Sequence, residues 1–249
     1  MTPEDTARAV KHDIGRLGGG FMLSEQAKAA SVSAGIGAWA MYMLGRGGVL
    51  GDVNPDVVTA AFYFFPPSSV HKGWSKGRAV ITPAGATSLF TGACHEWGRQ
   101  NLADVKDAER LNDLLARVAA AANPAGVPLF AGWRAVPLAV DPPARLAQLS
   151  HVLREYRGGV HGLCCVASGL SPLEAVLTGG GEGSARFFGW PEPYADVTHL
   201  VELRDQVETL TDQRAAAPWD ALDETEREEC VSLISAACEV APGFTPPGT

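Results

Sequence analysis

The chain has 249 residues, of which 46% are hydrophobic and 19% are charged, and its formal net charge at pH 7 is −8. This composition excludes an intrinsically disordered chain and is typical of a globular protein with a buried core. The negative charge repels phosphate backbones, so nucleic acid is not an expected partner.

The first half of the chain, residues 1–122, predicts a series of helices. Hydrophobic residues recur at the helical period, and the pairs Asn54-Pro55 and Thr82-Pro83 are typical of helix starts. Residues 68–82 are polar and contain several glycines, which predicts a loop. We expect helices over residues 3–17, 24–45, 55–65, 83–97 and 104–122.

A proline-containing connection, residues 123–141, leads to a second helical half, residues 142–240. Its first helix begins at Asp141-Pro142 and is expected to end near Tyr156, because Gly158-Gly159 favours a sharp backbone bend. Three glycines predict a flexible break over 179–181. Further helices are expected from 171, near 196–216 and near 223–238, and a frayed tail over 241–249. An alternating strand pattern is almost absent, which predicts an all-α fold, a multi-helix bundle around an apolar pocket.

The cysteines and the longest apolar run indicate where the protein resides. Five cysteines form no CxxC pair, and no leader-like segment begins the chain, so we expect a reduced, cytoplasmic protein. The apolar run over 34–44 is too short to span a bilayer, which needs about 20 residues. Cys94, His95 and Glu96 are adjacent and point in different directions on a helix, so we expect no metal site and no cofactor.

The segment over residues 153–161 concentrates the polar chemistry of the chain. Arg154 and Arg157 are three residues apart and share a helix face, and guanidinium groups bind carboxylate, sulfate or phosphate. His161 follows and could transfer a proton near neutral pH. One hypothesis is therefore an anion clamp, and the other is a structural network of ion pairs at a helix end.

Three further groups are candidates for binding. His71, Lys72 and Trp74 belong to a basic stretch that could hold an oxyanion, or could be a solvated surface loop. Arg46, between glycines, could cap the preceding apolar helix or point into a pocket. Tyr63 is one of four consecutive aromatic residues, which cannot all face one core, so some of them could line a cavity.

Four motifs resemble those of an actinobacterial family described as helix-turn-helix or MarR-like. The motifs are residues 41–51 with the sequence MYMLGRGGVLG, residues 61–70 with AFYFFPPSSV, residues 153–161 with LREYRGGVH, and residues 208–212 with ETLTD. They agree with the family in order and spacing over most of residues 21–240. The resemblance implies a helical protein with a winged helix-turn-helix.

The chain departs from this family where DNA would be read. The winged element of the family lies between a Gly-Trp pair and a Thr-Asp pair, which here are Gly189-Trp190 and Thr211-Asp212. The twenty residues between them can hold one helix and a turn, so we expect a remnant without a wing. That helix, over 196–210, carries mainly carboxylates, whereas DNA recognition needs donors for phosphates and base edges.

The preferred hypothesis is an enzyme of actinobacterial specialised metabolism that acts on a small anionic substrate, sulfated or phosphorylated, by elimination or cyclisation. Aziridine-forming enzymes of azinomycin-type pathways are an analogy in chemistry. The alternatives are a ligand-sensing MarR-like regulator with a degraded DNA-binding element, and a non-catalytic subunit that pairs with a copy of itself or with another protein. Substrate contacts are expected from Arg46, Arg154, Arg157, Tyr63, Trp74 and Lys72, and proton transfer from His161 or His71.

Overall fold

The computed structural model describes residues 1–242 and is 75% helical, with no strand in that range. The expected all-α fold is therefore confirmed. The tail over 243–249 lies outside the described residues. The helices are α1 (Pro3–Gly19), α2 (Glu25–Ser33), α3 (Ala38–Gly47), α4 (Pro55–Phe62), α5 (Pro67–Arg78), α6 (Pro83–Asn101), α7 (Ala108–Ala121), α8 (Pro128–Ala135), α9 (Pro142–Ala167), α10 (Pro172–Phe188), α11 (Val201–Arg214) and α12 (Glu224–Val240), with short 3-10 turns η1 (Gly48–Leu50), η2 (Thr198–Leu200) and η3 (Ala217–Ala221).

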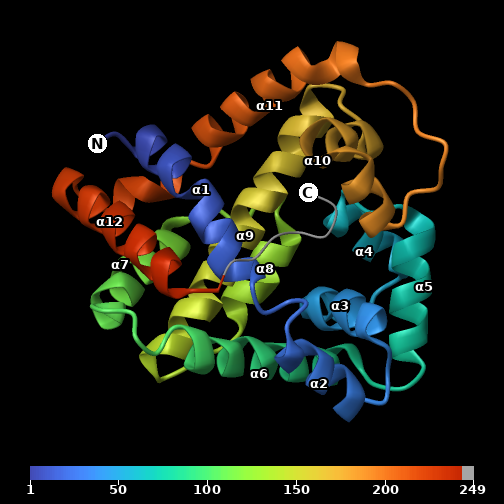
Figure 1. Cartoon of the computed structure of the whole chain (residues 1–249), viewed down its shortest axis with the longest axis horizontal. Helices are drawn as coiled ribbons and strands as arrows, with labels where there is room; N and C mark the ends of the chain where they lie inside the picture. Colours follow the sequence, from blue (N-terminus) through green and yellow to red (C-terminus); the bar gives the residue numbers. More distant parts are fainter. Residues whose placement is uncertain (243–249) are drawn as a thin grey trace.

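Helix α9 runs through the middle of the molecule, and several other helices pack around it (Figure 1). Its neighbours are α1, α6, α7, α8 and α11. Buried apolar residues from both halves of the chain form one continuous hydrophobic cluster, from Ala7 in α1 to Ala241 after α12. Side chains of α9 therefore face several helices at once, which explains why most of its residues up to Tyr156 are buried.

The helix that was expected to end near Tyr156 continues to Ala167, so that prediction was wrong. Gly159 and Gly162 serve close packing against neighbouring segments rather than a bend. A Cβ atom at Gly159 would lie 2.6 Å from Val127 Cγ1, and one at Gly162 would lie 3.3 Å from Tyr63 Cγ. Both glycines let a neighbouring segment approach the helix, a requirement that local sequence does not reveal.

We expect opposite effects from two adjacent glycine substitutions in α9. A Cβ at Gly158 meets no atom within 4 Å, so Gly158→Ala should stabilise the protein by about 0.5–1 kcal/mol through the helix propensity of alanine. Gly159→Ala should destabilise it by about 1–3 kcal/mol, because Val127 must be displaced. Urea unfolding of the two variants measures both effects, and equal effects would show that Val127 does not constrain Gly159.

The polar stretch over 68–82, expected to be a loop, forms helix α5 over most of its length. Pro67 occupies the first helical turn, where the missing N–H is harmless, so it starts α5. The preceding helix, expected over 55–65, has already ended at Phe62. The glycines again face a neighbouring helix. A Cβ at Gly73 would lie 2.6 Å from Met43 Cγ, and one at Gly77 would lie 3.0 Å from Leu44 Cδ2, so α5 packs closely on α3.

Other expected helix boundaries were met in part. The helix expected over 24–45 is split into α2 and α3 at Gly35, whose φ is +68°. The expected break over 179–181 is confirmed at Gly181, which has a non-helical backbone with φ +67°. The connection over 123–141 contains α8. Between residues 190 and 212 the chain forms η2 and one long helix, α11, as expected for a segment without a wing.

Within residues 1–242, no single helix is both long enough and apolar enough to cross a membrane. Helices α9 and α10 pass only when they are taken together, as a pair bent by 119°.

Candidate functional site

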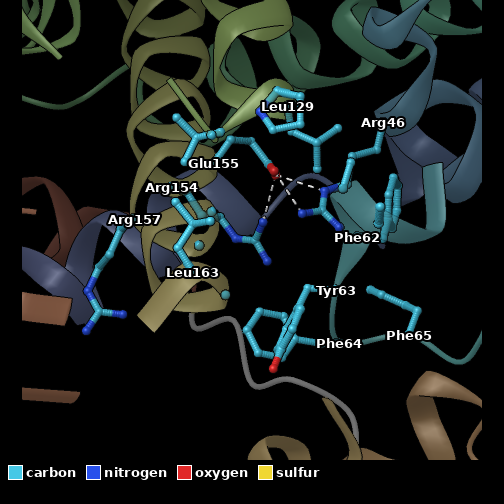
Figure 2. Close-up of a pocket in the computed structure, with 18 of the residues that line it drawn as sticks. Arg46, Phe62, Tyr63, Phe64, Phe65, Leu129, Arg154, Glu155, Arg157 and Leu163 are labelled. Atoms are coloured by element: carbon cyan, nitrogen blue, oxygen red, sulfur yellow. Dashed lines mark hydrogen bonds and ion pairs between the residues drawn. The ribbon is translucent and has the colours of Figure 1, made fainter. Parts of the chain in front are cut away.

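A cavity of about 280 Å³ lies between α1, α3, the end of α4, the start of α8 and α9. One wall is aromatic and comes from the segment over 62–65, with Phe188 of α10 beside it. Leu129, Leu163 and Val166 add aliphatic surface, and a cluster of charged side chains closes the opposite side (Figure 2). The cavity therefore offers an apolar body and a charged end, as small-molecule sites commonly do.

The charged end is built around Glu155 of α9, which lies between two arginines (Figure 2). Arg46 Nε and Nη2 donate to the two carboxylate oxygens of Glu155, both at 2.8 Å, and Arg154 Nη1 donates to Oε1 at 3.0 Å. The side chain of Glu155 is only 2% exposed, whereas that of Arg154 is 30% exposed. The ring of Phe62 lies 4.5 Å from the guanidinium carbon of Arg46 and covers it.

The electrostatics keep this cluster ionised. Burial alone would raise the pKa of Glu155, but the adjacent Arg46 guanidinium outweighs burial and lowers that pKa to about 2. The carboxylate in turn keeps the pKa of Arg46 above its usual value in spite of burial. Arg46 is therefore engaged in a buried ion pair with Glu155. Arg154 makes only one bond to Glu155 and has further N–H groups at the cavity.

Cations outnumber anions around the cavity. Lys11, Arg46, Arg154 and Arg157 line it, and the only lining carboxylate among the described residues is Glu155. This balance is the reverse of that of the whole chain, whose net charge is −8. The lining side chains therefore carry an excess of positive charge, although Lys11 and Arg157 are also paired with carboxylates of α11 that do not line the cavity.

The four consecutive aromatic residues point in different directions because the backbone turns sharply at Tyr63. This residue has φ +39° and ψ −60°, and the Phe64 N–H donates to the Phe62 carbonyl across the turn. Such a conformation is strained in a residue other than glycine. The Tyr63 hydroxyl donates to the Leu170 carbonyl at 2.7 Å and burial raises the pKa of this phenol, so Tyr63 is held against the cavity in its neutral form.

His161 lies behind the cavity wall rather than in it. Its ring stacks on Phe64 at 5.6 Å, and its Nδ1 is 2.9 Å from Thr211 Oγ1. Because that hydroxyl donates to the Val207 carbonyl, it accepts from Nδ1–H, which leaves Nε2 to accept from the thiol of Cys165 at 3.8 Å. Burial lowers the pKa of His161 to about 4, so the imidazole is neutral at pH 7.

Arg157 has its guanidinium turned away from the Glu155 cluster (Figure 2). It reaches α11, where Nη2 is 2.7 Å from Glu208 Oε2 and 3.0 Å from Asp212 Oδ1. Its side chain still contributes to the cavity wall. Of the two arginines of the 153–161 segment, Arg154 faces the cavity with donors to spare and Arg157 is paired.

A comparison with known protein families matches residues 7–199, about three quarters of the chain, to a helix-turn-helix family. The chain belongs to this helix-turn-helix family. No curated protein and no solved structure matches the chain. The family assignment predicted from the four motifs is therefore confirmed at this level, and the matched region contains the cavity but ends before α11.

The basic stretch of α5, which contains His71, Lys72 and Trp74, lies apart from the cavity. His71 pairs with Asp56 at 2.7 Å on the surface. Lys72 lines a separate hollow between α5 and the connection of α2 to α3, and Trp74 is buried in the core. The structure thus brings Arg46, Tyr63, Arg154 and Arg157 together, but not His71, Lys72, Trp74 or His161.

Two charged residues of the site were absent from the residues expected to bind the substrate. Lys11 is a single lysine in an ordinary amphipathic helix, and no local signal marks it. Glu155 stands between the expected Arg154 and Arg157 in the sequence, so its position next to them could have predicted that it belongs to the same site. Within residues 1–242, no three His, Cys, Asp or Glu side chains gather at one point that could hold a metal ion.

The buried histidines predict that this protein loses stability in mild acid. Burial lowers the pKa of His151 to about 3 and that of His161 to about 4, from an ordinary value of 6.5. The unfolded chain therefore binds more protons below pH 6.5, and each histidine costs up to about 1.4 kcal/mol of stability per pH unit. Glu155 and Glu208, each with a pKa of about 2, add to the loss below pH 4.5.

Urea unfolding at pH 7, 6, 5 and 4 measures this loss. The free energy of unfolding should fall steadily below pH 6.5, and His161→Gln should reduce the slope. A constant free energy between pH 7 and pH 5 would show that neither imidazole is kept neutral by burial.

Proposed function

We propose that the cavity binds a small organic anion with an apolar body, and that the protein is an enzyme acting on it. The observation that carries this proposal is the set of cationic side chains lining one apolar hollow in an acidic chain. Guanidinium and ammonium groups bind sulfate, phosphate and carboxylate by charge-assisted hydrogen bonds. The aromatic wall over 62–65 would hold the remainder of the molecule.

The reaction that suits this site best is the departure of an anionic group. Arg154 can stabilise negative charge as it develops on a leaving sulfate or phosphate, while a nucleophile within the substrate closes a ring or a base outside the protein removes a proton. The neutral His161 lies behind Phe64, so acid–base catalysis by histidine has less support. Ring closure of this kind is the chemistry of aziridine formation in actinobacterial specialised metabolism, which we propose as the setting.

Binding is tested first, by isothermal titration calorimetry with 2-naphthalenesulfonate and with 2-naphthol. The two probes share an aromatic body and differ in charge. The sulfonate should bind with a dissociation constant below about 1 mM and at least about tenfold more tightly than the naphthol. Equal affinities, or no binding of the sulfonate, would overturn the proposal. Release of sulfate from an aromatic β-amino sulfate, followed by ion chromatography, tests the reaction.

A second candidate, a ligand-sensing regulator of the MarR type, is favoured by membership of a helix-turn-helix family. Against it, α11 exposes Glu202 and Asp205 and carries few donors for DNA. A gel-shift experiment at low salt with fragments of the source genome separates the candidates. Retention of one fragment that the naphthalenesulfonate reverses would support the regulator.

A further inference from the structure

Two of the cations that line the cavity also bind α11. Arg157 contacts both Glu208 and Asp212, as described above. Lys11 Nζ of α1 is 2.9 Å from Asp212 Oδ2 and 3.7 Å from Glu208 Oε2. Lys11 and Arg157 therefore face the cavity on one side and two carboxylates of the same helix on the other.

The two carboxylates bind the same two cations that an anionic group in the cavity would need. Asp212 is buried, with 4% of its side chain exposed, and Glu208 is half-buried. Burial would raise the pKa of Glu208, but Arg157 and Arg204 together lower it to about 2, so it is an anion at neutral pH. The Nε of Arg157 is buried and has no hydrogen-bond partner within the described residues, which leaves this side chain a donor to spare.

Each carboxylate also lies near a third cation, besides Lys11 and Arg157. Glu208 is bound by Arg204 of the same helix, one turn away, and Asp212 lies 3.9 Å from Arg8 of α1. If an external anion took Lys11 and Arg157, both carboxylates would keep a cation within reach. The exchange would leave no charge buried without a partner, which removes the main cost of breaking a buried ion pair.

We infer that Lys11 and Arg157 form a second anion subsite of the cavity, which Glu208 and Asp212 block by binding both cations. The ligand is a small molecule with two anionic groups. This inference rests on the proposed function, because the first anionic group is placed at Arg154. The second group displaces the carboxylates of α11, and its arrival loosens the contact of α11 with α1 and α9.

The test compares 2-naphthalenesulfonate with 2,6-naphthalenedisulfonate, which share a body and differ by one anionic group. Isothermal titration calorimetry is done on the wild-type protein, Glu208→Gln and Asp212→Asn. Each substitution removes one internal carboxylate and preserves its shape. We expect each variant to bind the disulfonate about tenfold more tightly than the wild type does, with the monosulfonate unchanged to within about twofold. Melting temperatures identify a variant that fails to fold. If one of the two does not fold, the affinities of the other variant test the inference.

The matched control is Glu202→Gln, the same change of charge on an exposed residue of α11 that makes no ion pair within the described residues. It should alter neither affinity, because solvent screens its charge. An equal gain in affinity for both probes, or a gain in affinity in the control variant, would show that the effect comes from the net charge of the protein. Either result would overturn the inference. If the monosulfonate fails to bind the wild type, the proposed function fails, while a selective gain for the disulfonate still reports the second subsite.

Discussion

Replacing Arg154 with glutamine should weaken the binding of 2-naphthalenesulfonate by about 10- to 100-fold, the loss expected when a charge-assisted hydrogen bond of about 1.5–3 kcal/mol is removed. The fold should be spared. Arg154 makes one bond to Glu155, and that carboxylate keeps both bonds to Arg46 when Arg154 is gone. Calorimetry measures the affinity, and the melting temperature measures the fold.

Two comparisons make this result specific to the cavity. Arg99→Gln removes an arginine of similar charge on the surface, where it pairs with Asp141, and should leave the affinity unchanged. Arg154→Lys keeps the charge but loses the planar fork, so its affinity should be intermediate. Normal binding by a folded Arg154→Gln variant would show that the arginines serve only the structural ion-pair network.

The helix starts of this protein were predictable because they depend on neighbouring residues. Asn54, Asp141 and Ser171 each accept a backbone N–H in the first turn of their helix, and each precedes a proline. The helix ends were less predictable where glycines occur. Gly77 and Gly159 lie inside helices because another helix or segment approaches them there, and such an approach depends on tertiary packing.

The site shows the same division between local and tertiary information. The sequence indicated Arg46 and Arg154 as cationic residues near apolar helices, and the structure places both beside one cavity. The sequence predicted a loop where α5 forms, and it did not show that this helix turns Lys72 toward a separate hollow, so Lys72 was expected at the same site. The position of His161 depends on α11, whose Thr211 hydroxyl fixes the imidazole behind Phe64.

Replacing Glu155 should have the largest effect on stability. Glu155→Gln leaves Arg46 buried without its counter-ion, and breaking a buried pair in this way costs about 3–5 kcal/mol. For a chain of this size the melting temperature should fall by roughly 2–4 °C per kcal/mol. Differential scanning fluorimetry measures the fall, and Glu96→Gln, which removes an exposed carboxylate on α6, is the matched control and should change it little.

The double variant Arg46→Met with Glu155→Leu separates stability from function. Two apolar side chains of similar volume can replace a buried ion pair with little loss, so the double variant should be more stable than either single variant. It should still bind the sulfonate poorly, because Arg154 loses the carboxylate that positions it. Stability without binding would indicate that the buried pair exists to position Arg154, whereas a double variant as unstable as the single ones would make the pair a requirement of the fold.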